Sequence, residues 1–246
     1  MKKLSLLLMA LALFASPAVA LAAKPTTTTT VSQLAGSPYT SGQVGTDVSY
    51  PNCSASNPNS PFGVVGVTGG LAYSQNSCLL LESLWYPNLS LYMNTGLNAS
   101  ETSTYYVAAE ANCNGDLVCA AYNYGYTAAQ NAVSYANSQG AVATTWWLDV
   151  ETGNSWTADY AQNIASLQGN YDALKANGIT NVGVYSTTVQ YGSITGGWQN
   201  GWPNWGATTV RTAGNAAGFS TGHAFTGGPT WLIQFRGRTL DQDYSC

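Results

Sequence analysis

The stretch Thr144-Thr145-Trp146-Trp147-Leu148-Asp149-Val150-Glu151 decides the predicted fold. It has the apolar, aromatic character of a buried strand over residues 144–150 and ends in two acidic residues. Because side chains alternate along a strand, Trp147, Asp149 and Glu151 are expected on one face, with the Cα atoms of the two acids about 7 Å apart. A charge that follows an apolar run costs free energy unless it is exposed or paired. This strand end is therefore a candidate functional site.

Helical patterns flank this strand on both sides. One covers residues 127–138, with Thr127 as the expected N-cap and Gly140 just past the end. A longer amphipathic helix is predicted over residues 159–176. Seven further short strands are predicted at residues 44–49, 62–67, 89–93, 182–186, 205–210, 231–235 and 240–244. Eight buried strands that alternate with helices predict an α/β fold with a closed TIM-like barrel, more strand-rich after residue 190.

The first residues predict export. Lys2 and Lys3 precede an apolar run over residues 4–14, which is too short to span a bilayer, and small residues that fit a cleavage site follow. We therefore expect a signal peptide over residues 1–22, a Thr/Ser/Pro-rich tether over residues 23–43 and one domain over residues 44–246. The mature chain is expected outside the cell, with no membrane segment after cleavage of the signal.

The composition argues against nucleic acid as a partner. Only 7% of the residues are charged, and the formal net charge is −4. A chain this poor in Lys and Arg lacks the basic surface that binds phosphate backbones.

Five cysteines in an exported chain favour disulfides over a metal site. The close pair Cys113 and Cys119 is the first expected bridge and Cys53 with Cys78 the second, which leaves Cys246 over. No CxxC motif occurs, and the single histidine, His223, is expected on a surface or loop. We expect neither a metal nor another cofactor.

Two neighbouring carboxyls on a partly apolar surface should differ in pKa, and glycoside hydrolysis needs such a difference. The alternative is structural: Asp149 caps the following turn and Glu151 is simply solvated. Asp47 lies near the end of the first strand, and Asp241 and Asp243 lie in the last. Because a closed barrel makes the first and eighth strands neighbours, Asp47 and Asp241 are expected to face the pair across the mouth.

A group of tryptophans lies among Gly and Asn residues at Trp198, Trp202 and Trp205. Their rings can form one wall of a glycan groove, since flat aromatic faces stack on sugars, or a small core beneath a long loop. Both interpretations remain open at this point. Trp146 and Trp231 are expected to pack between barrel and helices.

The order of five motifs resembles glycoside hydrolase family 25, the lysozyme-like muramidases. These motifs are Asp-x-Ser from Asp47, Leu-Asp-Val-Glu from Leu148, Val-Tyr-Ser from Val184, Trp-Leu-Ile-Gln-Phe from Trp231 and Asp-x-Asp from Asp241. The match covers residues 44–246. The Asp-Val-Ser-Tyr-Pro and Trp-Trp-Leu-Asp-Val-Glu-Thr signatures look closer to a secreted actinobacterial-type branch.

The resemblance implies five β/α units followed by three strands, and cleavage of the β-1,4 bond between N-acetylmuramic acid and N-acetylglucosamine in peptidoglycan. It implies Glu151 as general acid, with Asp149 positioning the substrate acetamido group, which can itself act as the nucleophile. Asp47 and Asp241 become supporting carboxylates. The residues that the resemblance and the aromatic pattern assign to substrate binding are Tyr92, Tyr185, Trp147, Trp202 and Gln234.

Two features depart from the family pattern. Val67-Thr68-Gly69-Gly70 stands where the family usually has a longer polar motif, and residues 100–126 look like an insertion. A non-catalytic glycan- or cell-wall-binding barrel is therefore the alternative function, and a structural coat or adhesion protein is a third. We expect a monomer.

Overall fold

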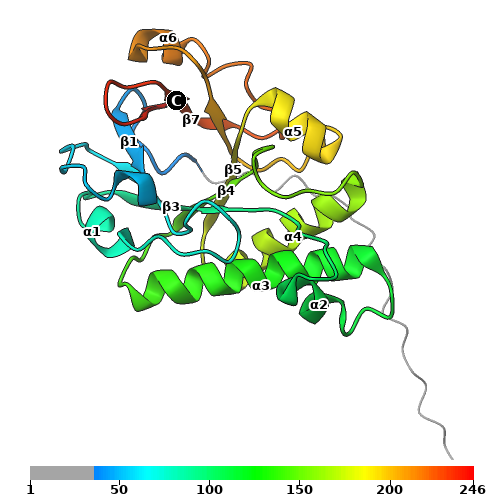
Figure 1. Cartoon of the computed structure of the whole chain (residues 1–246). Coiled ribbons are helices and arrows are strands. Elements are labelled where there is room, and N and C mark those ends of the chain that lie inside the picture. The colour runs from blue at the N-terminus through cyan, green and yellow to red at the C-terminus, as the bar shows by residue number, and fades with distance from the viewer. Residues whose placement is uncertain (1–35) are drawn as a thin grey trace, which may run out of the picture. The chain divides into compact units, whose positions relative to one another are not determined.

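The computed structural model describes residues 36–246, and the expected signal peptide lies outside them. Eight strands form a closed barrel in sequence order (Figure 1). Neighbouring strands from β1 to β7 are parallel, whereas β8 is antiparallel to both β7 and β1. The predicted α/β barrel is confirmed. Its strands are β1 Val44–Val48, β2 Gly63–Gly66, β3 Leu89–Asn94, β4 Thr145–Asp149, β5 Asn181–Ser186, β6 Asn204–Ala207, β7 Thr230–Phe235 and β8 Gln242–Ser245.

The direction of β8 follows from the length of its connection. Only residues 236–241 separate β7 from β8. A parallel crossover needs a dozen or more residues, so a linker this short can only return the chain as an antiparallel neighbour. As a result β8 begins, rather than ends, at the barrel end where the parallel strands finish.

The helices between the strands are uneven. They are the 3-10 helix η1 Tyr50–Asn52, then α1 Leu79–Ser83, α2 Thr104–Glu110, α3 Leu117–Ser138, α4 Tyr160–Ala176, α5 Thr188–Thr195 and α6 Ala213–Ala217. The long helix predicted over residues 159–176 is confirmed within one residue, with the Asp159 side chain accepting from Ala161 N. In the first two of the five implied β/α units the helix is short: the 3-10 helix η1 follows β1, and the five-residue α1 follows β2. A further short helix, α6, follows β6.

The start of α3 was predicted wrongly. The helix begins at Leu117 rather than after Thr127, because the Asp116 carboxylate caps it by accepting from Val118 N and Cys119 N. The segment that looks like an insertion is α2 together with the first half of α3, tied by the Cys113–Cys119 disulfide. The end of α3 is as predicted: the helix stops at Ser138, and Gly140, two residues beyond, has a φ of +70°.

The helices α3 and α4 lie side by side along the outside of the barrel (Figure 1). Two glycines allow their backbones to touch. A Cβ on Gly125 would lie 1.9 Å from Ser166 O, and one on Gly169 would lie 2.1 Å from Tyr122 O. The close contact of these helices therefore requires glycine at both positions.

The barrel interior below the mouth is filled by aromatic side chains, chiefly Tyr39, Phe62, Trp147, Trp205 and Trp231. Trp147 is fully buried, and a Cβ on Gly183 would lie 2.4 Å from its ring. The expectation that Trp147 binds substrate is wrong, because its face of β4 points into this core beneath the mouth.

Two other expectations need correction for the same reason. Trp231 packs inside the barrel, where its ring meets Trp147 edge to face, rather than between barrel and helices. Tyr39 falls in the predicted tether but is only 5% exposed, and its hydroxyl contacts Ser90 Oγ and Trp147 Nε1. The ordered domain therefore begins before Val44.

Two disulfides join the cysteines as expected. Cys53 is bonded to Cys78 and Cys113 to Cys119, and within residues 36–246 Cys246 is left without a disulfide partner. No helix in the described part of the chain is both long and apolar enough to cross a membrane.

Candidate active site

A cavity of about 320 Å³ opens at the barrel end where the parallel strands finish. Asp149 is the last residue of β4, and Glu151 follows two residues later. Asp47 reaches the cavity from β1, and Asp241 directly precedes the antiparallel β8. All four predicted carboxylates therefore line one cavity. Its other walls include the predicted residues Tyr92, Tyr185 and Gln234, together with Ser49, Pro51, Asn52 and Trp205.

Asp149 is buried, with 3% of its surface exposed. Burial and the adjacent Glu151 raise the pKa of the Asp149 carboxyl well above its usual range, and a hydrogen bond from Asn94 opposes that rise. Asp149 therefore holds its proton to higher pH than an exposed aspartate. Glu151 is the partly exposed member of the pair, and Gln190 Nε2 on α5 lies 3.5 Å from its Oε1.

A chain of hydrogen bonds fixes the Asn94 amide that contacts Asp149. Asn94 N donates to Thr68 Oγ1 at 2.8 Å, so the Thr68 hydroxyl proton points elsewhere and is donated to Asn94 Oδ1 at 2.7 Å. Asn94 Nδ2 is then left to donate to Asp149 Oδ2. Thr68, Asn94 and Asp149 stand at the ends of three consecutive strands. Sequence reasoning missed Asn94, although its place at the end of the strand beside β4 was a usable signal.

Asp47 belongs to a second polar chain. Gln234 Nε2 donates to Asp47 Oδ2 at 3.0 Å, and the Tyr185 hydroxyl donates to Gln234 Oε1 at 2.8 Å. Burial raises the pKa of Asp47 to about 7, with Asp241 adding to the rise and the Gln234 hydrogen bond opposing it.

Asp243 is a buried carboxyl that the site prediction did not include. It is fully buried in the barrel, where its Oδ1 accepts from Trp205 Nε1 at 2.7 Å. Burial, and then the nearby Asp47, raise the pKa of Asp243 well above its usual range. Asp241, the predicted member of the pair, is instead exposed at the rim, where its backbone oxygen accepts from Asp47 N. Two residues apart, these acids share one face, but Asp241 stands just before β8 at the rim and Asp243 lies one step deeper inside the barrel.

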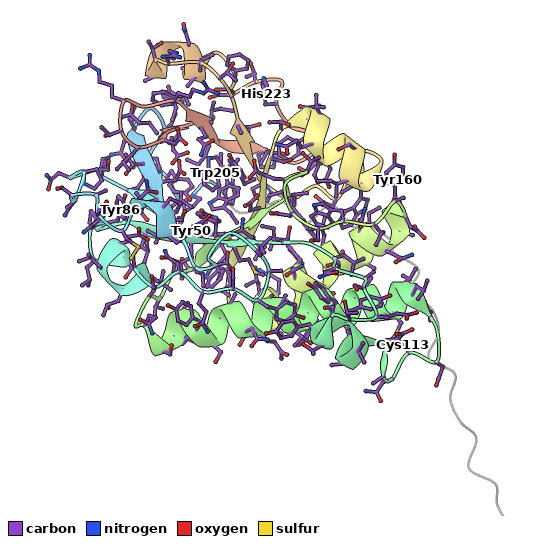
Figure 2. All side chains as sticks on the ribbon, viewed as in Figure 1. Tyr50, Tyr86, Cys113, Tyr160, Trp205 and His223 are labelled. Atoms are coloured by element: carbon purple, nitrogen blue, oxygen red, sulfur yellow. A yellow bond between two sulfur atoms is a disulfide. The ribbon has the colours of Figure 1, made fainter. Side chains whose placement is uncertain are left out.

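The tryptophan cluster divides into two groups. Trp202 is 6% exposed and stacks on Tyr171 of α4 with ring centroids 4.1 Å apart, while Trp198 meets it edge to face. The expectation that Trp202 binds substrate is therefore wrong: it belongs to the main apolar core between the strands and the surrounding helices. Of the three tryptophans, only Trp205, which is labelled in Figure 2, lines the cavity.

His223 lies on the segment between α6 and β7 (Figure 2), and its ring packs against Phe219. Among residues 36–246, no three His, Cys, Asp or Glu side chains gather in a way that would hold a metal ion.

Comparison with known proteins gives the fold and the family. A curated relative, the probable GH family 25 lysozyme 5 of Dictyostelium discoideum, is 38% identical over 62 residues, which is 24% of this chain and 29% of that protein. The bacterial lysozyme of Streptomyces coelicolor superposes with a TM-score of 0.55 at 18% identity, covering 84% of this chain and 93% of that one. GHIP, a glycosyl hydrolase 25 of Streptococcus pneumoniae, gives 0.52 at 15% identity, covering 83% and 87%. At these identities the two superpositions establish a shared fold.

The family model described as lysozyme-like protein 1 matches residues 64–220, more than half of the 246 residues. The matched stretch contains the Asp149–Glu151 pair, Tyr92 and Tyr185. The chain therefore belongs to the lysozyme-like protein 1 family.

Proposed function

We propose that this protein is a secreted glycoside hydrolase that cleaves β-1,4 bonds in peptidoglycan, in the manner of a muramidase. The observation that carries the proposal is the Asp149–Glu151 pair at the mouth, with one carboxyl buried and its neighbour partly exposed in a cavity. Family membership supports it, as do the names of similar proteins, which are lysozymes and a glycosyl hydrolase 25.

Glu151 is the proposed proton donor because it is the accessible member of the pair. Asp149, whose pKa is raised, holds a proton and passes it to the neighbouring Glu151, and Glu151 delivers it to the bridging oxygen as the bond from that oxygen to the sugar C1 breaks. The substrate's acetamido oxygen, positioned by Asp149, attacks C1 from the opposite face. Water then opens the cyclic intermediate, and its proton returns to Glu151.

The remaining cavity residues are assigned to substrate binding and support. Tyr92, Tyr185 and Gln234 offer rings and polar groups to the sugar, with Gln234 and Tyr185 already held by hydrogen bonds. Asp47 and Asp241 supply negative charge opposite the pair, which favours the positive charge that develops at C1.

Export and organisation form part of the same proposal. The signal-peptide pattern of residues 1–22 and the two disulfides support a secreted protein. We also propose a single catalytic domain that acts as a monomer, in the secreted actinobacterial-type branch indicated by the Asp47 and Trp146 signatures.

The experiment compares the parent protein with Glu151→Gln on purified cell walls, following loss of turbidity and release of reducing ends. Glu101→Gln, at an exposed position far along the chain, is the matched control. We expect loss of activity in Glu151→Gln alone, by a factor of about 100 or more. Equal activity in both variants would refute the role of Glu151. A parent protein that is retained on insoluble wall without releasing fragments would support the non-catalytic binding module instead.

A further inference from the structure

A groove continues from the carboxylate cavity over the rim of the barrel. A second hollow of about 470 Å³ shares Pro51 and Asn52 with that cavity, and a third of about 350 Å³ shares Thr239 and Leu240 with the second. The three hollows therefore form one path that starts at Glu151 and ends beside Arg238.

The two walls of this groove are fixed by different parts of the chain. One wall is the segment after β1, residues 51–60, which the Cys53–Cys78 disulfide ties to the residue that precedes α1. The other is the short connection between β7 and β8, residues 236–241. A disulfide and a tight hairpin both limit motion, so the groove is held open before any ligand binds.

The lining changes in charge along the path. The first hollow has Asp47, Asp149, Glu151 and Asp241, the second has mainly neutral groups such as Asn52, Ser54 and Ser56, and the third has Arg238. Only four of the seven basic residues, Lys175, Arg211, Arg236 and Arg238, fall within residues 36–246. In a domain with few charges, most of them acidic, the Arg238 guanidinium thus lies at one end of the groove and the carboxylates lie at the other.

We propose that this groove binds the peptide substituents of the glycan strand, with Arg238 pairing with a peptide carboxylate. The inference rests on the proposed function and narrows its substrate class to peptide-bearing strands rather than bare polysaccharide. An arginine fork matches a carboxylate through two parallel hydrogen bonds, and the hydroxyl and amide groups between suit the polar backbone of a short peptide. A sugar bound over Glu151 would direct a substituent along this path.

The test measures binding without turnover, with full-length protein carrying Glu151→Gln. Three ligands are compared: peptide-bearing glycan strands, the same strands with their peptides removed, and neutral chitin oligosaccharides. Arg238→Gln is expected to weaken binding of the peptide-bearing strands about threefold at low salt, which is the scale of an exposed ion pair. The difference should shrink as salt is raised, and binding of chitin should stay the same.

Arg211→Gln is the matched control, because Arg211 is also exposed but lies outside the three hollows. An equal loss in the Arg211 variant, or no loss in the Arg238 variant, would overturn the proposal. An Arg238 effect of the same size on peptide-free strands would also overturn it, by assigning the contact to the sugar's own lactyl carboxylate. The two proposals fail separately, because failure of the parent protein to hydrolyse cell walls concerns turnover and this assay measures binding.

Discussion

Gln234 Nε2 donates a 3.0 Å hydrogen bond to Asp47 Oδ2, joining β7 to β1 past the antiparallel β8 that lies between them. The amide is oriented by the Tyr185 hydroxyl, which donates to its oxygen. The hydrogen bond stabilises the charged form of Asp47, against burial and Asp241, which favour the protonated form. A neighbour two strands away therefore limits how far burial raises the pKa of Asp47.

Replacing Gln234 with Met, which is of similar length but has no donor, should raise the pKa of Asp47 above its value of about 7. Tyr185→Phe should cause a smaller rise, because it leaves the donor in place but less firmly oriented. A carboxyl-carbon NMR titration of the parent and both variants measures the change. An unchanged or lower pKa in Gln234→Met would mean that the hydrogen bond does not govern this group.

Asp243 should make stability depend on pH. Burial and Asp47 raise the pKa of Asp243 in the folded protein above the unfolded value of 3.8. The folded state therefore favours the protonated carboxyl. The stability that this preference contributes is fully present below pH 3.8 and is lost as the pH rises through the folded pKa. Asp243→Asn keeps the acceptor for Trp205 Nε1 and removes the charge. We expect its Tm to exceed that of the parent by on the order of 3 °C at pH 8 and to equal it near pH 3.

Glu101→Gln, which removes a charge at an exposed site, serves as the comparison for that measurement. A gain of the same size at both pH values in Asp243→Asn would show a packing effect in place of a titration. A lower Tm for Asp243→Asn at pH 8 would show that the charged form of Asp243 stabilises the barrel, which contradicts the expected cost of burying that charge.

The contact between α3 and α4 should be sensitive to a single methyl group. Gly169→Ala would place a Cβ 2.1 Å from Tyr122 O on α3, which must force the helices apart at a cost of about 1–3 kcal/mol. Gly192→Ala, inside α5 with no atom within 4 Å of the added Cβ, is the matched control and should stabilise by about 0.5–1 kcal/mol. Urea unfolding gives both values, and a neutral Gly169→Ala would mean that the helices separate freely.

Local sequence signals were enough to predict the strands, because short apolar runs bounded by Gly and Pro are distinctive. They also predicted that Asp47, Asp149, Glu151 and Asp241 meet, since strand ends of a closed barrel share one mouth. They could not give the depth of a residue along the barrel axis. Trp147 and Asp149 share a face of β4, yet one fills the core and the other reaches the cavity.

Depth also explains the other errors. Asp241 and Asp243 are equivalent in sequence pattern, and only the start of β8 at the mouth leaves one at the rim and the other inside. Trp202 could not be told from Trp205 before the register of β6 was known, because both stand in the same Gly-rich stretch. Tyr39 lies five residues before β1, in a segment whose composition suggests a linker. It is buried against side chains from several strands of the barrel, so its burial cannot be predicted from the local sequence.

The direction of the Asn94 amide should depend on a single hydroxyl. Thr68→Val preserves shape but removes both the acceptor for Asn94 N and the donor to Asn94 Oδ1. The amide is then free to turn its oxygen toward Asp149, which stabilises only the protonated carboxyl and so raises the pKa of Asp149 further. If the proposed function is correct, kcat should fall about 10- to 100-fold with KM little changed, because a hydrogen bond to a charged group is worth roughly 1.5–3 kcal/mol.

Thr68→Ser keeps the hydroxyl and should retain most of the activity, along with the parent pH profile. Equal loss in the Ser and Val variants would trace the effect to packing around Thr68 rather than to the orientation of the amide.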